Sequence, residues 1–116
     1  MSTSLCSFNV RGLGNKTKRD QMFHWLKQKS YSICLLQETH LTVKDENLWK
    51  TEWGGSCFFS GESSNKAGVS ILLNPNLNYD IVQYKDIIPG RVQALELILN
   101  EKTVTILNIY GQIMTV

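Results

Sequence analysis

Two stretches in the first half of the chain have the polar and apolar pattern of helices. Residues 18–29 carry apolar side chains at the i, i+3 and i+4 spacing of one helix face: Met22, Trp25 and Leu26. Thr17 and Asp20 have the spacing of a capping box, so we expect this helix to begin near residue 18. A shorter helix is expected over residues 43–53, ending at Gly54.

The remaining apolar residues form short runs that are typical of strands. An extended stretch runs from about Ser4 to Asn9, and residues 33–36 form a continuous apolar run that predicts a buried strand. Further strands are expected at residues 57–60, 68–73, 79–84, 92–99 and 103–110. Turn-forming residues separate them at 74–76 and 100–102, and the second turn is expected to join a hairpin.

Polar side chains stand where three of these strands end. Asn9 ends the first stretch, Glu38 follows the apolar run, and Tyr110 ends the last strand. A carboxylate at the C-terminal end of a buried strand lies at the rim of a sheet, where ligands and hard metal ions bind. The alternative for Glu38 is the start of a solvated loop.

The last strand places its polar residues on one face. The two-residue period of a strand puts four side chains on the same side: Val104, Ile106, Asn108 and Tyr110. Asn108 and Tyr110 therefore point the same way, which suits a site. The alternatives are a surface Asn beside an edge Tyr, or an Asn108 that supports Tyr110 without contacting substrate.

These strand-end elements resemble the endonuclease/exonuclease/phosphatase family, and above all the endonuclease domain of LINE-type retrotransposons. The matching elements are Asn-x-x-Gly-Leu at 9–13, Gln-Glu-Thr-His at 37–40 and Asn-Ile-Tyr at 108–110, with comparable segments at 66–73 and Gly90-Arg91. The motifs occur in order across residues 4–112 of one partial domain, 1–116. The resemblance implies an α/β fold, the N-terminal half of a four-layer α/β/β/α sandwich, and we expect one mixed, mostly antiparallel sheet with helices on one face.

The resemblance also implies roles for six residues. Glu38 matches the family's ligand to a divalent cation, Mg²⁺ or alternatively Mn²⁺, and Asn9 matches the Asn that helps to orient that metal site. Tyr110 matches the Tyr that reaches the scissile phosphate. We expect His40, Arg11 and Asn108 to bind substrate, although His40 is equally well explained as a solvated loop residue. Lys16, Lys18 and Arg19 are further candidates for phosphate contacts, or else an exposed helix face.

The 116 residues lack two elements that the family's chemistry uses. In the family an Asp-x-Asn element beyond the Asn-Ile-Tyr strand supplies the general base and its partner, and a Ser-Asp-His element completes the site. Within the 116 residues, neither element is found after Tyr110. We therefore expect a truncated metal-dependent DNA endonuclease domain that is inactive alone, since positioned proton transfer contributes about 100-fold or more. The alternatives are a non-catalytic module that self-associates through an exposed sheet face, and a phosphatase acting on small phosphate esters.

Composition excludes some classes of protein and favours none of these functions. Hydrophobic residues make up 42% of the chain, and 12 basic against 10 acidic residues leave a net charge of +2, which does not itself predict nucleic-acid binding. The apolar runs are too short to cross a membrane, and residues 1–10 show no secretory signal, so we expect an intracellular protein, nuclear or cytoplasmic. Cys6, Cys34 and Cys57 lack zinc-site spacing and are expected to be buried free thiols.

Overall fold

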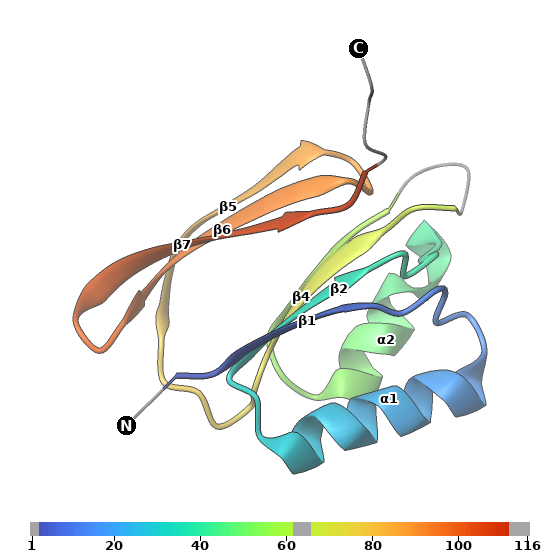
Figure 1. The fold of residues 1–116 in the computed structure, drawn as a ribbon, viewed down its shortest axis with the longest axis horizontal. Coiled ribbons are helices and arrows are strands. Elements are labelled where there is room, and N and C mark those ends of the chain that lie inside the picture. The colour runs from blue at the N-terminus through green and yellow to red at the C-terminus, as the bar shows by residue number, and fades with distance from the viewer. Residues whose placement is uncertain (1–2, 62–65, 112–116) are drawn as a thin grey trace.

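A computed structural model describes residues 3–61 and 66–111, which form two α-helices, one 3₁₀ turn and seven strands. Figure 1 shows both helices lying against one side of the strands. The helices are α1 (Lys16–Lys29) and α2 (Glu46–Trp53), and the 3₁₀ turn η1 (Val43–Asp45) precedes α2. The strands are β1 (Leu5–Asn9), β2 (Ile33–Gln37), β3 (Cys57–Ser60), β4 (Val69–Leu73), β5 (Asp80–Ile88), β6 (Val92–Leu99) and β7 (Lys102–Ile109).

The strands form two sheets, so the expectation of a single sheet is wrong although the α/β class and the sandwich are confirmed. The first sheet has the order β1-β2-β4-β3, with β1 parallel to β2 and the other pairs antiparallel. The second has the order β5-β6-β7 and is entirely antiparallel. Strand patterns in a sequence do not specify hydrogen-bond partners, and the link at residues 74–79 carries the chain from one sheet to the other.

The continuous apolar run of β2 is explained by cover on both faces of the first sheet. Cys34 and Leu36 face a core shared with the helices. Ile33 and Leu35 face a second core shared with Leu95, Leu97, Leu99 and Ile106 of the other sheet. A strand covered on both faces needs apolar residues at every position, whereas β6 and β7 alternate because only one of their faces is covered.

The outer face of the second sheet carries exposed apolar residues. We expected the inward face of a sheet to lack its partner, and that expectation is wrong because the two sheets cover each other's inner faces. Instead Ile98, Leu107 and Ile109 point outward and are 36%, 54% and 61% exposed. Among the described residues the layers are therefore helices, first sheet and second sheet, and the helices cover only the first sheet (Figure 1).

Both predicted helices form, with a correction at the start of each: residues 43–45 form η1, so α2 begins at Glu46 and not at residue 43. The N-cap of α1 is Asn15, whose side chain accepts a hydrogen bond from the backbone N–H of Lys18, so the predicted Thr17–Asp20 capping box is wrong. Asn15 has extended backbone angles and an oxygen within reach of the first turn, which makes it the better cap and starts the helix two residues earlier. The second helix ends at Gly54, as predicted, in a left-handed conformation.

Candidate functional site

The loops that follow β1 and β2 are joined by backbone hydrogen bonds. Asn9 lies opposite Gln37 in the parallel register, so Glu38 begins the loop directly beside the end of β1. Beyond the strands, the N–H of Val10 donates to the carbonyl of Gln37 at 3.0 Å and the N–H of Gly12 donates to the carbonyl of Glu38 at 2.6 Å. The pairing therefore continues past the sheet and holds the two motif loops together.

The side chain of Glu38 contacts a residue from the second sheet. The Tyr110 hydroxyl donates a hydrogen bond to Oε1 of Glu38 at 2.7 Å. The two residues are 72 positions apart in the sequence, and they meet because β2 and β7 both end at the same edge of the sandwich. Both side chains are half-buried, so their polar atoms remain within reach of a ligand. Asn9, Glu38 and Tyr110 thus share one edge of the molecule.

Two further loops complete this edge. The N–H of Thr39 donates to the carbonyl of Gly68 at 3.2 Å, and the N–H of Gly68 donates to the carbonyl of Gly90 at 2.9 Å. Gly68 has a φ of +119°, and a Cβ added there would collide with the Thr39 side chain. Glycine is required because only it combines this backbone angle with such close contact. The segments around 66–73 and 90–91 therefore build the wall of the site.

Three residues of the motif loops have left-handed backbone angles without being glycine. Arg11, Glu38 and His40 have φ values of 52°, 55° and 57°. Residues other than glycine are uncommon in this region and cost about 1–3 kcal/mol each, which neighbouring structure must offset. Such strain concentrates at functional sites. Three of the six non-glycine residues with positive φ in the described part of the chain lie in the two loops beside Tyr110, which supports a binding or catalytic role for this edge.

Asn108 lies inside the sandwich beneath this edge. It is 1% exposed, and its amide nitrogen donates to the carbonyls of Leu36 and Ser70 and to Oε1 of Gln93, at 2.9–3.1 Å. Its oxygen accepts from the amide of Gln37 at 2.9 Å. These bonds tie β7 to three strands, including two of the other sheet, and so fix where Tyr110 emerges. The burial fits the supporting role, while its expected contact with substrate stays a prediction.

His40 and Arg11 lie beside the loop that follows β1. The His40 ring packs against Gly12, where an added Cβ would approach Nδ1 to 2.8 Å. Arg11 is exposed, and its N–H donates to the side-chain oxygen of Asn9 at 3.1 Å. That bond closes an Asx turn and orients Asn9. The expected substrate contacts of His40 and Arg11 stay predictions.

The basic residues of α1 act mainly as structural ties. Arg19 is 3% exposed and pairs with Glu52 at 2.6 Å, so its expected place on an exposed face is wrong. The Arg19 guanidinium also lowers the pKa of the Glu52 carboxyl. Lys16 bonds to Asp20 and to Glu52, which raises the pKa of Lys16. Lys18 donates to the carbonyls of residues 10 and 11, at 2.7 and 3.2 Å, and so holds the loop after β1.

Arg91 is a site residue to which the sequence assigned no role. Its guanidinium carbon lies 5.7 Å from the centre of the Tyr110 ring, and its carbonyl accepts a hydrogen bond from the Tyr110 N–H at 2.7 Å. The contact arises because Val92 pairs with Ile109 in the antiparallel register. Arg91, which precedes Val92, therefore lies beside Tyr110, which follows Ile109. The hairpin signal was visible in the sequence, but the register that pairs Arg91 with Tyr110 was not.

The donor atoms of this edge suit a hard divalent cation. Among residues 3–61 and 66–111 there is no cluster of three or more His, Cys, Asp or Glu side chains. Glu38 supplies one carboxylate, and the Asn9 oxygen keeps a second lone pair beyond its bond to Arg11. Mg²⁺ requires oxygen ligands and retains several waters, so one or two protein ligands are enough. Glu38 and Asn9 therefore fit Mg²⁺ or Mn²⁺.

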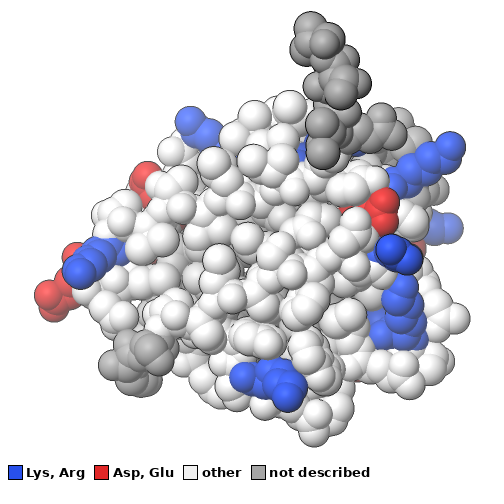
Figure 2. Space-filling model, in the orientation of Figure 1, with Lys and Arg blue, Asp and Glu red and all other residues white. Residues whose placement is uncertain are grey.

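Charge on the face that carries β1 and β7 is unevenly distributed. Figure 2 shows Lys and Arg side chains at the right-hand end of this face, together with acidic atoms, over the loops that follow β1 and β2 in Figure 1. The middle of the face is largely uncharged. In the described part of the chain, no helix has the length and apolar character needed to cross a membrane.

Comparisons with known proteins identify a family and similar folds. A sequence model of the Endonuclease/Exonuclease/phosphatase family matches residues 6–111. A 149 kDa protein of transposon TX1 from Xenopus laevis is 31% identical over 111 residues, which cover 96% of this chain and 8% of that protein.

Two solved structures share the fold. TDP2 from Caenorhabditis elegans matches with a TM-score of 0.70 and 19% identity, and an AP endonuclease from Archaeoglobus fulgidus with 0.66 and 19%. The match covers 97% of this chain and 36% of TDP2, and 94% of this chain and 41% of the AP endonuclease. The chain thus spans well under half the length of each of these relatives.

Proposed function

Because the chain belongs to the endonuclease/exonuclease/phosphatase family, we propose that it is the N-terminal part of a metal-dependent DNA endonuclease domain of the LINE-retrotransposon type. The observation that carries this proposal is the hydrogen bond of 2.7 Å between the Tyr110 hydroxyl and the Glu38 carboxylate, which unites motif residues from both sheets. The likeness to a transposon protein favours a mobile-element nuclease over other branches of the family. In this proposal residues 1–116 are a partial domain, with its motifs at 4–112.

In this proposal Glu38 and Asn9 hold Mg²⁺ or Mn²⁺ at the ends of β1 and β2. Their neighbouring places in the parallel register and their oxygen donors support the assignment. When bound, such a cation polarises a phosphodiester and stabilises the charge that develops on its leaving oxygen. The Asx turn from Asn9 to Arg11 keeps the Asn9 oxygen directed at the loop edge.

Tyr110 and Arg91 bind the phosphate in the proposed site. The Tyr110 hydroxyl has one hydrogen, which Glu38 accepts in the absence of substrate and a non-bridging phosphate oxygen can accept when substrate is present. The Arg91 guanidinium packs on the Tyr110 ring, which restricts both side chains and places a permanent positive charge beside the phosphate. Arg11 and His40, in the loops that follow β1 and β2, extend this contact along the DNA backbone in this proposal.

We further propose that the 116-residue chain alone does not cleave DNA at a measurable rate. Residues 1–116 contain no Ser-Asp-His element and no Asp-x-Asn element after Tyr110. A site that binds the phosphate but has no positioned general base reacts about 100-fold or more slowly than one that has such a base. What the chain retains is the ability to hold a cation and a phosphate.

Two measurements test these statements separately. The first incubates the purified chain with supercoiled plasmid and Mg²⁺ and follows nicking on a gel. We expect none above background, and nicking that Glu38→Ala abolishes would contradict the inactivity. The second titrates Mn²⁺ against the chain and records bound metal by electron paramagnetic resonance.

The matched control for metal binding is Glu101→Gln. Glu101 is an exposed carboxylate in the β6–β7 turn, at the far end of β7 from Tyr110. We expect Glu38→Gln to weaken Mn²⁺ binding by about tenfold or more, because one charged ligand is lost, and Glu101→Gln to leave it unchanged. Equal binding by wild type and Glu38→Gln would reject the proposed metal site.

A second function, self-association without catalysis, is favoured by the open side of the sandwich. A cavity of about 540 Å³ lies between the sheets, lined by β1, β2 and β7 residues such as Leu5, Leu35 and Ile106. β1 and β7 are both edge strands, which present unpaired backbone groups. In this reading the chain pairs with a second copy through these edges. A concentration-independent monomer in sedimentation equilibrium would exclude it.

A further inference from the structure

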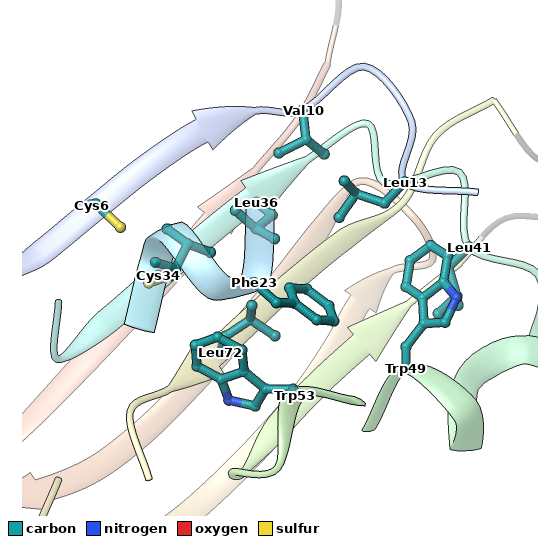
Figure 3. Close-up of a cluster of buried hydrophobic side chains, with 11 residues drawn as sticks. Cys6, Val10, Leu13, Phe23, Cys34, Leu36, Leu41, Trp49, Trp53 and Leu72 are labelled. Atoms are coloured by element: carbon teal, nitrogen blue, oxygen red, sulfur yellow. The ribbon is translucent and has the colours of Figure 1, made fainter. Parts of the chain in front are cut away.

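Two of the three cysteines lie opposite each other in the first sheet. Cys6 of β1 and Cys34 of β2 are partners in the parallel register. Both belong to the core that faces the helices, so their side chains project from the same face of the sheet (Figure 3). Neighbouring strands lie about 4.8 Å apart, which falls within the 4.4–6.8 Å between Cα atoms that a disulfide needs. The backbone can therefore accept a bond between the two sulfurs.

The two thiols lie opposite each other on neighbouring strands and differ in burial. Their interaction lowers the pKa of Cys6 and raises that of Cys34. Cys6 is 9% exposed and lies on an edge strand, whereas Cys34 is fully buried. The arrangement places one thiol on an edge strand and the other beside it in the interior. Cys57 offers a contrast, since burial raises its pKa to about 11 and its register partner is Leu72.

We propose that Cys6 and Cys34 are a redox-active dithiol that hydrogen peroxide converts reversibly into a cross-strand disulfide. The Cys6 thiolate attacks one peroxide oxygen, the O–O bond breaks, and hydroxide leaves, which gives a sulfenic acid on Cys6. The Cys34 sulfur then displaces the hydroxyl group, and the second oxygen leaves as water. The pair loses two protons and two electrons, and peroxide is reduced to two waters.

The disulfide would tie together the two strands that carry Asn9 and Glu38 at their ends. It closes a loop that contains the whole of α1, and a cross-link over such a loop restricts the unfolded chain. We therefore expect oxidation to raise the unfolding temperature. This inference rests on the register of the sheet and is independent of the proposed nuclease function.

The test oxidises the folded 116-residue protein with hydrogen peroxide and then alkylates the remaining thiols with N-ethylmaleimide in denaturant. Intact-mass analysis should show that the alkylated thiols fall from three to one and return to three after dithiothreitol. Peptide mapping of the oxidised wild type should recover the segments around Cys6 and Cys34 as one linked species. The same treatment in 8 M urea (about the concentration that unfolds most domains) should lose this selectivity.

Cys57→Ser is the matched control. It should leave no alkylated thiol after oxidation, while Cys34→Ser should stop at sulfenic or higher acids on Cys6 with no intramolecular cross-link. Three alkylated thiols remaining in the oxidised wild type would overturn the proposal, as would linked peptides that contain Cys57. Peptide mapping of the oxidised wild-type protein tests the proposed disulfide even if Cys34→Ser does not fold.

Discussion

Replacing Asn108 with Ala tests whether this residue acts as a structural tie between the sheets. Its side chain is 1% exposed and engages four partners: the carbonyls of Leu36 and Ser70, and the amides of Gln37 and Gln93. The amide has two hydrogens, so its three acceptors share them in bifurcated bonds. Ala would leave all four partner groups without this bond. Three of them lie in the interior of the sandwich, whereas the Gln37 amide is half-buried and keeps its bonds to Ser7 and Leu35.

The size of the effect follows from the cost of buried polar groups that lose their partner. Each buried polar group that loses its partner costs about 1–3 kcal/mol of folding free energy. Water that enters the site and relaxation of the neighbouring side chains recover part of this cost, so we expect a total loss of stability of about 4 kcal/mol. Stability of roughly 0.05–0.15 kcal/mol per residue places a domain of this size at about 6–17 kcal/mol. The substitution therefore removes a large share of stability without necessarily unfolding the protein.

Urea unfolding followed by the fluorescence of the buried Trp49 and Trp53 provides the assay. With an m-value of about 2 kcal/mol/M, the loss corresponds to a midpoint lower by about 2 M. Asn47→Ala is the control, because Asn47 is exposed on α2 and its substitution should change stability by less than about 0.5 kcal/mol. A double-mutant cycle with Gln37→Ala should also give a coupling above about 1 kcal/mol.

A different outcome would refute this reasoning. Should Asn108→Ala be as stable as Asn47→Ala while binding DNA or Mn²⁺ less tightly, Asn108 would be a ligand contact. The burial argument would then be wrong, and the role expected from the resemblance would stand.

Three further substitutions test the supports of the site. Glu52→Gln should cost about 2 kcal/mol near neutral pH, because it removes the carboxylate that Arg19 binds. The pKa of Glu52 is lowered in the folded protein, so the stability that its ionised carboxylate contributes is complete above the unfolded pKa near 4.5 and is lost as the pH falls through the folded pKa. The Glu52→Gln variant should therefore lose less stability than the wild type when the pH is lowered. Stability curves against pH that run parallel for the two proteins would contradict this. Gly68→Ala should lower the free energy of unfolding in urea by about 2–3 kcal/mol, because Gly68 has a positive φ and the Thr39 side chain lies close to it. Gly14→Ala is the control, since the added methyl group would enter open space and should not destabilise the protein. Lys18→Met keeps the aliphatic part of the side chain but removes its hydrogen bonds to the loop after β1. Amide hydrogen exchange in that loop should accelerate by about fivefold, which corresponds to about 1 kcal/mol. Unchanged exchange would show that these hydrogen bonds do not stabilise the loop.

The positions of the elements were largely predictable because local patterns determine them. The strands at 57–60 and 92–99 have the bounds that the sequence predicted, and the second helix ends at Gly54 as expected. Turn residues and apolar periodicity act over a few neighbours, so they are readable without tertiary information. The N-cap of α1 was predicted wrongly because Thr17 and Asp20 match the spacing of a capping box, whereas the extended backbone angles that make Asn15 the cap are seen only in the structure.

The sequence by itself determined which residues carry the candidate chemistry, because Asn9, Glu38 and Tyr110 stand at strand ends within ordered motifs. Only the tertiary structure decided that Glu38 and Tyr110 meet, that Arg91 packs on the Tyr110 ring, and that Asn108 lies within the core. These facts depend on which strands pair, in what register, and in which sheet. Such pairings join residues far apart in the sequence, and a pattern of local preferences holds no information about them.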